Sequence, residues 1–396
     1  MSSTAGATAF TARIGRIEIS ATMAINSEAT TMRSEGVDLV DFGAGEPHFT
    51  TPEHIKQAGI DAIQKNFTKY TPVAGIKELR VAVAMRHKQD FGSNYSFEET
   101  IVSTGGKNAL FNTFQVLIDH GDEVIIPVPY WVSFKDMVEF CGGKCNFVAT
   151  HAEEGFRLTA AMIEKAITPR TRIILLNSPN NPSGVVIAPE DLTAIVKLAA
   201  SRGIFVMADE CYVYLDYTGN RFSLGSLTEY KDSLLLMGSL SKTYSMTGWR
   251  LGYALAPKAV IGQLQKLQSQ STSNPTSIVQ KAGLVALTAP QECVEEMRVE
   301  YIRLRDRMVA GLRSIPGVKV NLPEGAFYTF PDVSEVTARA GIDTTKLTSR
   351  LLREAHVVGV PGEAFGMPGH IRLSYATSPG EIDRGIERVR TFFASF

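Results

Sequence analysis

The chain has 396 residues, of which 44% are hydrophobic and 20% are charged, and this is the usage of an ordinary globular protein of about two to three domains. Its 40 lysines and arginines are balanced by 41 acidic residues, so the net charge of -1 disfavours a protein that holds nucleic acid mainly through phosphate contacts. No apolar run is long enough to cross a bilayer, and residues 1–10 lack the basic start and apolar core of a signal peptide, so we expect a cytoplasmic protein that binds no membrane.

The first unit of the chain is the N-terminal segment, residues 1–45. Its pattern does not fit the sheet predicted for the following residues, and we expect it to pack with the smaller domain at the other end of the sequence.

Short apolar runs then alternate with helical stretches, and each run ends in a polar or glycine-rich turn. This alternation predicts βαβ units and an α/β domain over residues 46–288, in which helices cover both faces of a mostly parallel sheet. The predicted strands are residues 101–104, 123–128, 172–176, 204–207, 234–237 and 251–255.

A long helix followed by a smaller α+β domain is predicted for residues 289–396. Apolar residues recur at steps of three and four from Val294 to Leu312, which places them on one helical stripe. Pro290 suits the start of this helix, and Pro316 suits its end. Shorter units are expected at residues 318–320, 326–330, 345–355, 357–358, 371–374 and 380–393.

Polar residues collect at the carboxyl ends of the predicted strands, where an open parallel sheet binds its ligands. Ordinary strand ends also carry polar turns, so each residue alone is a weak signal. Their convergence on one edge predicts a ligand site. The residues are Gly105, Gly106, Lys107, Trp131, Asn177–Asn181, Asp209, Tyr212 and Ser239–Lys242.

A glycine turn stands between the predicted strand 101–104 and the next helix. Gly105 and Gly106 leave free backbone N–H groups at the positive end of a helix dipole, which suits a phosphate. A plain glycine turn explains the pattern equally well. The Gly-x4-Gly-Lys-Ser/Thr spacing of the Walker motif is absent.

Lys242 directly follows the buried run 234–237 and its Gly-Ser turn. Burial lowers the pKa of an amine and makes it a better nucleophile towards an aldehyde. Ser239 and Arg250 flank this lysine with a hydroxyl and a guanidinium that could hold a phosphate. The segment therefore predicts a reactive lysine beside an anion.

An acidic residue, Asp209 or its neighbour Glu210, ends the very apolar run 204–207. A carboxylate in such a place is costly unless it meets a cation, and a protonated pyridine nitrogen is one candidate. A helix cap or a structural ion pair is the alternative. Since side chains alternate along a strand, only one of the two acids should face the site.

No metal site is predicted. The cysteines form no Cys-x-x-Cys pair and have no further ligands at metal spacing, so we read them as reduced thiols. The 7 histidines show no metal spacing either. The cysteines are Cys141, Cys145, Cys211 and Cys293.

Several segments, taken in order, resemble the class I aminotransferases, which depend on pyridoxal 5'-phosphate (PLP). Because they are independent and span about Ile14 to the C-terminus, they are more specific than one short match. The resemblance implies the PLP-dependent transferase fold of the aspartate aminotransferase type. The matching segments are Gly43–Pro47, Thr68–Tyr70, Asn177–Gly184, Ala208–Tyr212, Ser239–Arg250 and Ile371–Tyr375.

The resemblance implies a role for each cofactor-binding residue. Lys242 would bond covalently to PLP and then carry the proton, Asp209 would pair with the pyridine nitrogen, and Trp131 would stack on the ring. Asn181 and Tyr212 would bind the ring hydroxyl oxygen. The phosphate would be held by Gly105, Gly106, Lys107, Ser239 and Arg250, with Tyr70 supplied by the other subunit of a homodimer.

The substrate residues follow from the same likeness. Arg372 would bind the α-carboxylate with two parallel hydrogen bonds, which lysine cannot copy. Gly45, Trp131 and Asn181 would line the same pocket. A surface ion pair for Arg372 and a core position for Trp131 are the alternatives.

The closer likeness is to the bacterial aspartate aminotransferases, a subgroup that includes enzymes accepting prephenate. There Lys107 would meet the distal carboxylate of the substrate, and Thr22 lies in a stretch similar to the segment that closes over the pocket. His48 and Thr50 stand where members of the subgroup often have aspartate, which bears on substrate range.

These residues imply a transaminase, aspartate:2-oxoglutarate aminotransferase with ping-pong kinetics, with prephenate as a possible further acceptor. An aminotransferase of the aromatic, methionine or alanine type and a PLP-dependent β-lyase stay open as alternatives. A transcriptional regulator with a degenerate aminotransferase domain would need a basic DNA-binding module, for which the N-terminal segment is short. The expected partners are amino acids, 2-oxo acids and a second copy of the chain, with no nucleic acid.

Overall fold

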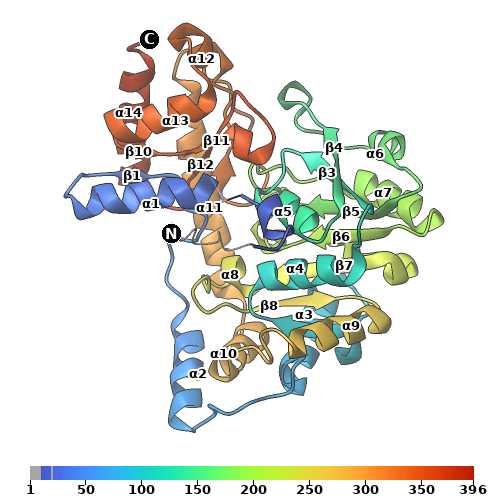
Figure 1. Ribbon diagram of the computed structural model, residues 1–396. Coiled ribbons are helices and arrows are strands. Elements are labelled where there is room, and N and C mark those ends of the chain that lie inside the picture. Colours follow the sequence, from blue (N-terminus) through green and yellow to red (C-terminus); the bar gives the residue numbers. More distant parts are fainter. Residues whose placement is uncertain (1–9, 19–20) are drawn as a thin grey trace, which may run out of the picture.

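A seven-stranded sheet with the order β2-β8-β7-β6-β5-β3-β4 forms the centre of the larger part of the molecule (Figure 1). The computed structural model describes residues 10–18 and 21–396, except for the side chains of residues 21–24 and 26. The strands are β2 (Thr100–Ser103), β3 (Glu123–Val128), β4 (Lys144–Ala149), β5 (Thr171–Asn177), β6 (Phe205–Asp209), β7 (Leu234–Ser239) and β8 (Gly252–Leu255).

The prediction of a mostly parallel sheet is confirmed. The pairs β4–β3, β3–β5, β5–β6 and β6–β7 are parallel. Strand β8 runs against its neighbours, because residues 240–251 lead the chain directly back beside β7 instead of crossing over the sheet.

Helices cover both faces of the sheet, and alternate residues of the central strand β5 enter two separate apolar cores. Ile174 and Leu176 face one core, whereas Ile173 and Leu175 face the other. The first core also receives α2 (Glu53–Gln64), α3 (Lys77–Phe91), α6 (Ala160–Ala166), α7 (Pro189–Ser201) and α10 (Ser277–Thr288). The second receives α4 (Gly106–Leu117), α5 (Ser133–Phe140) and α9 (Lys258–Ser269).

The long helix α11 (Glu292–Arg313) has the predicted apolar stripe, which is buried from Val294 to Leu312. It leads to the smaller part, where β11 (Val360–Pro361), β12 (Ile371–Ser374) and β9 (Tyr328–Thr329) form an antiparallel sheet. Figure 1 shows α12 (Ser334–Ala340), α13 (Thr344–Ala355) and α14 (Pro379–Phe393) gathered there with α1 (Ala21–Ser34) beside them.

The N-terminal segment divides between the two parts. Ala29 of α1 packs with Leu352 and Val358 of the smaller part, and β1 (Val40–Asp41) pairs in parallel with β10 (Val357–Val358). The 3-10 helix η1 (Ile14–Arg16) instead lies against α5, where Arg16 Nη1 donates to Glu139 O at 3.5 Å. The expected packing with the smaller part therefore describes α1 and β1 but not η1.

Two predicted features differ in detail. Strand β4 was not predicted because it lies at the sheet edge and only Val148 of its six residues is buried. The expected unit at residues 318–320 makes a single bridge, between Lys319 and Asp332. The remaining short elements are α8 (Leu240–Thr243), η2 (Phe97–Glu99), η3 (Ala152–Glu154), η4 (Val213–Leu215), η5 (Leu224–Ser226), η6 (Thr228–Ser233) and η7 (Gly362–Phe365).

Within the described part of the chain, no helix combines the length and the apolar character needed to cross a membrane.

Candidate active site

A cavity of about 330 Å³ lies at the carboxyl ends of β5, β6 and β7, at the edge where the strand ends predicted a site. Residues from the smaller part close its other side. Its lining comprises Gly45, Gly106, Lys107, Leu110, Trp131, Val132, Ser133, Asn177, Asn181, Asp209, Cys211, Tyr212, Ser239, Ser241, Lys242, Arg250, Tyr328 and Arg372.

Lys242 enters the cavity from α8, the short helix that follows β7. The side chain of Ser239 caps this helix by accepting the Ser241 N–H at 3.1 Å. The Lys242 ammonium donates to the carbonyl oxygen of Gly45. Burial lowers the pKa of Lys242 from 10.5 to about 8, so far more of it is the nucleophilic free amine near neutral pH than for an ordinary lysine.

Asp209 ends β6 with its carboxylate on the cavity side. It is buried, and the backbone N–H of Cys211 donates to its Oδ1 at 3.2 Å. Burial raises the pKa of Asp209 to about 6, so the carboxylate is destabilised and a cation beside it would stabilise the ionised form. Glu210 points to the opposite side of the strand, where Ser223 and Leu224 bind it.

An anion-binding element lies where α4 begins. Gly105 has a φ of +85°, and a Cβ there would stand 2.6 Å from the guanidinium Nη2 of Arg250. Only glycine therefore lets Arg250 reach the free N–H groups of the helix start. Gly106 lies against Ser239, so N–H groups, a hydroxyl and a guanidinium meet at one end of the cavity, which suits a phosphate.

Arg372 reaches the cavity from β12 in the smaller part. Its Nη1 donates to Asn181 Oδ1 at 3.2 Å, and its Nη2 donates to the carbonyl oxygen of Gly43 at 2.7 Å. Its guanidinium carbon lies 4.6 Å from the centre of the Tyr328 ring. Arg372 is buried, and no carboxylate of the described residues pairs with it, so a surface ion pair is ruled out there. Its Nε is buried and has no hydrogen-bond partner within the described chain.

Tyr328 is a lining residue that sequence reasoning missed. Its hydroxyl lies 2.8 Å from that of Tyr212, and a Cβ on Gly45 would lie 3.2 Å from it. Burial raises the pKa of Tyr328 to about 12, so both hydroxyls remain protonated hydrogen-bonding groups. The aromatic run 326–330 predicts core packing, and nothing in its spacing separates this one cavity-lining hydroxyl from the buried rings beside it.

Trp131 and Lys107 lie in contact with each other in the cavity lining. The Lys107 Nζ lies 4.7 Å from the centre of the indole, and the indole packs edge-on against Phe134. Burial, together with the charge of Arg250, lowers the pKa of Lys107. Trp131 therefore belongs to the cavity wall as well as to the core beneath it.

Other predicted residues lie elsewhere. Gly105 stands behind the cavity wall, and Tyr70 is 91% exposed in an open hollow that also includes residues 272–274. Thr22 belongs to α1, but its side chain lies outside the described residues. The ring of His48 packs against Phe49 and not in the cavity. No cluster of potential metal ligands occurs in residues 10–18 and 21–396.

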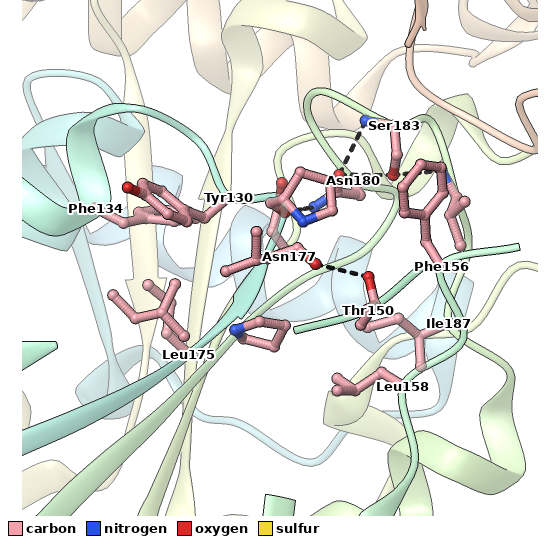
Figure 2. Close-up of a pocket in the computed structure, with 15 residues that line it drawn as sticks. Tyr130, Phe134, Thr150, Phe156, Leu158, Leu175, Asn177, Asn180, Ser183 and Ile187 are labelled. Atoms are coloured by element: carbon pink, nitrogen blue, oxygen red, sulfur yellow. Dashed lines mark hydrogen bonds between the residues drawn. The ribbon is translucent and has the colours of Figure 1, made fainter. Parts of the chain in front are cut away.

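A smaller pocket of about 40 Å³ adjoins the cavity and shares Asn177 with it. Figure 2 shows that apolar side chains line most of it and that its polar groups bind one another. Thr150 donates to the carbonyl oxygen of Val128 at 2.6 Å, and Ser183 donates to Asn180 Oδ1 at 2.7 Å. It is much smaller than the cavity that holds Lys242, Asp209 and Arg372, so the larger cavity is the candidate site.

Comparison with known proteins agrees with this geometry. The family model for aminotransferase class I and II matches residues 37–389. The chain is 41% identical to an aspartate aminotransferase of Bacillus sp. (strain YM-2), over 96% of this chain and 98% of that protein. It is 45% identical to the aspartate/prephenate aminotransferase of Thermus thermophilus, over 95% of this chain and 96% of that one.

Solved structures are similar over nearly the whole chain. An aspartate aminotransferase from Thermus thermophilus, solved with maleate, superposes with a TM-score of 0.93 at 43% identity and covers 98% of this chain and all of that one. The aspartate aminotransferase from Rhizobium meliloti has the same TM-score at 41% identity, with 98% and 99% covered.

Proposed function

Because the chain belongs to the class I and II aminotransferases, we propose that it transfers the amino group of aspartate to 2-oxoglutarate, with prephenate as a further acceptor to be tested. It has the aspartate aminotransferase-like fold and is a PLP-dependent transaminase. The preference for dicarboxylic substrates is the part that the proposal adds.

The residues of the cavity fit PLP. The glycine turn and Arg250 suit the phosphate, the reactive amine of Lys242 suits the aldehyde, and Asp209 suits a ring nitrogen that carries a proton. Bound PLP supplies an aldehyde that takes up the amino group and a ring that spreads the charge left when the α-proton departs.

Lys242 is the proposed acid–base group. Its lowered pKa lets the free amine take the proton from the substrate α-carbon and later return it. Asp209, oriented by the Cys211 N–H, would hold a negative charge for a protonated ring nitrogen. Trp131 and Tyr212 both line the cavity and would restrict the position of the ring.

Arg372 is the proposed site for the α-carboxylate. The carbonyl oxygen of Gly43 and the amide of Asn181 orient its guanidinium, and its Nε remains free. A planar guanidinium fixed in this way presents two parallel donors to a carboxylate.

The observation that carries the dicarboxylate proposal is a further cation in the same cavity, beside the three already assigned to the cofactor and the α-carboxylate. Lys107 lines it beside Trp131, and no ion pair with an acidic residue of the described chain neutralises it. A substrate with a carboxylate at each end would satisfy both Arg372 and Lys107. Aspartate, glutamate and prephenate all carry two carboxylates, whereas alanine and methionine carry one.

A half-reaction panel tests this proposal. The PLP-loaded protein is mixed with single amino acids, and the change of cofactor absorbance to that of pyridoxamine phosphate is recorded. Oxaloacetate, 2-oxoglutarate or prephenate is then added to reverse it. We expect rapid conversion by aspartate and glutamate, and return by prephenate would add that acceptor.

The variant Lys107→Ser sharpens the panel. It should slow conversion by dicarboxylic amino acids but leave conversion by alanine unchanged, and an equal loss with both would contradict the role of Lys107. Conversion only by aromatic amino acids, methionine or alanine would replace the proposed substrate. Release of ammonia and pyruvate without an oxo acid would indicate a β-lyase instead.

We also propose a homodimer in which Tyr70 of each subunit reaches the phosphate of the other site, which the exposure of Tyr70 supports. The domain division into residues 1–45, 46–288 and 289–396 is proposed with it, supported by the separate core around α11. A cytoplasmic location stays a prediction.

A further inference from the structure

Three buried polar residues behind the cavity take no part in the proposed mechanism. They are Glu210 at the end of β6, His87 on α3 and Ser223 before η5, with exposed fractions of 8%, 3% and 1%. They come from three segments of the chain and meet on the side of the sheet away from the cavity. Buried polar groups of this kind are costly unless they bind one another, so their purpose requires an explanation.

The carboxylate of Glu210 is held at both oxygens. Its Oε1 accepts the backbone N–H of Leu224 at 2.9 Å, and its Oε2 accepts the Ser223 hydroxyl at 2.7 Å. The His87 Nε2 lies 3.6 Å from the same Oε2 and 3.3 Å from the Ser223 Oγ. No lysine or arginine of the described residues forms an ion pair with Glu210.

The loop after Ser223 is pressed onto the histidine ring. A Cβ on Gly225 would stand only 2.5 Å from His87 Cε1, and the Ser223 Oγ also accepts the Gly225 N–H at 3.0 Å. The centre of the His87 ring also lies 4.9 Å from the centre of the Phe91 ring. The three side chains therefore form a closely packed network in which Glu210 has little freedom to move.

Residue types of a nucleophilic triad are present, but the geometry excludes that role. The Ser223 hydroxyl donates to Glu210 and not to the histidine, and all three side chains are buried. A fully enclosed hydroxyl cannot meet a substrate. The network must act through what it is attached to.

Glu210 belongs to the turn at residues 209–213, which carries cavity-lining residues. It stands between Asp209 and Tyr212 in sequence, and its N–H donates to the carbonyl oxygen of Met237 on β7 at 2.9 Å. Its own carbonyl oxygen accepts the Val213 N–H at 3.0 Å, which closes the turn that carries Tyr212. Any rotation of the Glu210 backbone would move both neighbouring cavity residues.

We infer that Glu210, held by Ser223 and His87, is a positioning residue that fixes Asp209 and Tyr212 against the PLP ring from the far side of the sheet. Groups that orient a ligand-binding side chain commonly change binding or activity by roughly 10- to 100-fold when they are removed. The inference rests on the cofactor site of this family and not on the proposed choice of aspartate as substrate.

The test compares Glu210→Ala with Glu123→Ala in the full-length protein. Glu123 is a matched control, since it is a buried glutamate that accepts hydrogen bonds from Thr168 and Arg170 at the opposite end of the sheet. Both variants should melt at lower temperature. Only Glu210→Ala should raise the PLP dissociation constant, by roughly tenfold, and lower kcat at nearly unchanged KM.

A conservative variant keeps the test informative if Glu210→Ala fails to fold. In Glu210→Gln the amide oxygen can still accept the Leu224 N–H, and the Ser223 hydroxyl can turn to donate to His87 Nε2. PLP affinity should then stay within about threefold of the parent, as for a hydrogen bond that is exchanged and not lost. Adding His87→Phe to Glu210→Gln removes the acceptor for the Ser223 hydroxyl, so PLP affinity should fall below that of Glu210→Gln alone.

Either of two results would overturn the inference. One is a Glu210→Ala protein whose PLP affinity and kcat match those of Glu123→Ala. The other is a double variant Glu210→Gln with His87→Phe that binds PLP as tightly as Glu210→Gln alone. PLP affinity is measured without any amino acid, so an incorrect choice of substrate would leave these readouts intact.

Discussion

At the scale of single residues, two cations that line one cavity have different tasks. The pKa of Lys242 is lowered to about 8, which favours reactivity. Arg372 is oriented by Gly43 and Asn181, which favours recognition. Each predicts an experiment of its own.

The pKa of Lys242 predicts how fast the apoenzyme bonds to added PLP at different pH. Only the neutral amine attacks an aldehyde, so the rate should rise as pH increases towards about 8 and level off above it. Stopped-flow absorbance at several pH values measures this. A rate that keeps rising to pH 10 would mean an unshifted lysine, and Lys242→Ala should show no covalent step at all.

The orientation of Arg372 predicts the effect of changing it to lysine. A point charge cannot supply two parallel donors, so kcat/KM should fall by roughly 10- to 100-fold for every amino acid, because all share the α-carboxylate. Half-reaction rates with aspartate and alanine measure the loss. A loss confined to aspartate would instead place the distal carboxylate at Arg372.

At the scale of elements, the phosphate end of the cavity depends on how closely β8 approaches the start of α4. A Cβ on Gly252 would lie 2.3 Å from the backbone nitrogen of Gly106 and 2.5 Å from the carbonyl carbon of Gly105. These are backbone atoms, so no side chain can move aside to relieve the clash. The glycine is required by close approach and not by its φ angle.

Gly252→Ala should therefore displace the glycine turn and weaken PLP binding. Overpacking of this kind costs about 1–3 kcal/mol, which corresponds to a loss of PLP affinity of roughly 5- to 150-fold. Gly262→Ala on α9 is the control, because a Cβ there meets nothing within 4 Å. Equilibrium dialysis with PLP compares the two, and equal affinities would show that the turn tolerates the shift.

The elements also show what the sequence could predict. Strands β5, β6 and β7 are buried apolar runs that a local sequence pattern predicts. The residues at their ends, Asn177, Asp209 and Ser239, were predicted to lie near one another, and all three line the cavity. The position of Arg372 beside Gly43 could not come from any local pattern, because 329 residues separate them. The family resemblance supplied Arg372 as a site residue but not its contact with Gly43, whereas Tyr328 was missed because an aromatic residue in a buried run resembles core.

At the scale of the whole molecule, Tyr70 lies in an exposed hollow and does not line the cavity of its own chain. Tyr70 is 91% exposed, and its neighbours in the hollow are residues 68–69 and 272–277. Tyr70 could therefore serve a phosphate only in the cavity of a second copy. The proposed dimer predicts that each site takes one tyrosine from the partner subunit.

Tyr70→Phe should then raise the PLP dissociation constant by roughly tenfold, the effect expected for losing a hydrogen bond to a charged group. Tyr230→Phe is a control, because Tyr230 of η6 packs against the apolar core and lines neither the active-site cavity nor the hollow around Tyr70. Sedimentation equilibrium establishes whether both variants remain dimers. Unchanged PLP affinity in a dimeric Tyr70→Phe protein would remove Tyr70 from the site.

A mixed dimer decides whether Tyr70 acts across the interface. Co-expression of a Lys242→Ala subunit with a Tyr70→Phe subunit gives a hybrid in which one site has both defects if Tyr70 serves the other subunit. The second site then combines an intact Lys242 with an intact Tyr70, and it should bind PLP covalently with the affinity of the unaltered protein. If Tyr70 instead serves its own subunit, the site that keeps Lys242 lacks the hydroxyl, and the hybrid should bind PLP as weakly as the Tyr70→Phe homodimer.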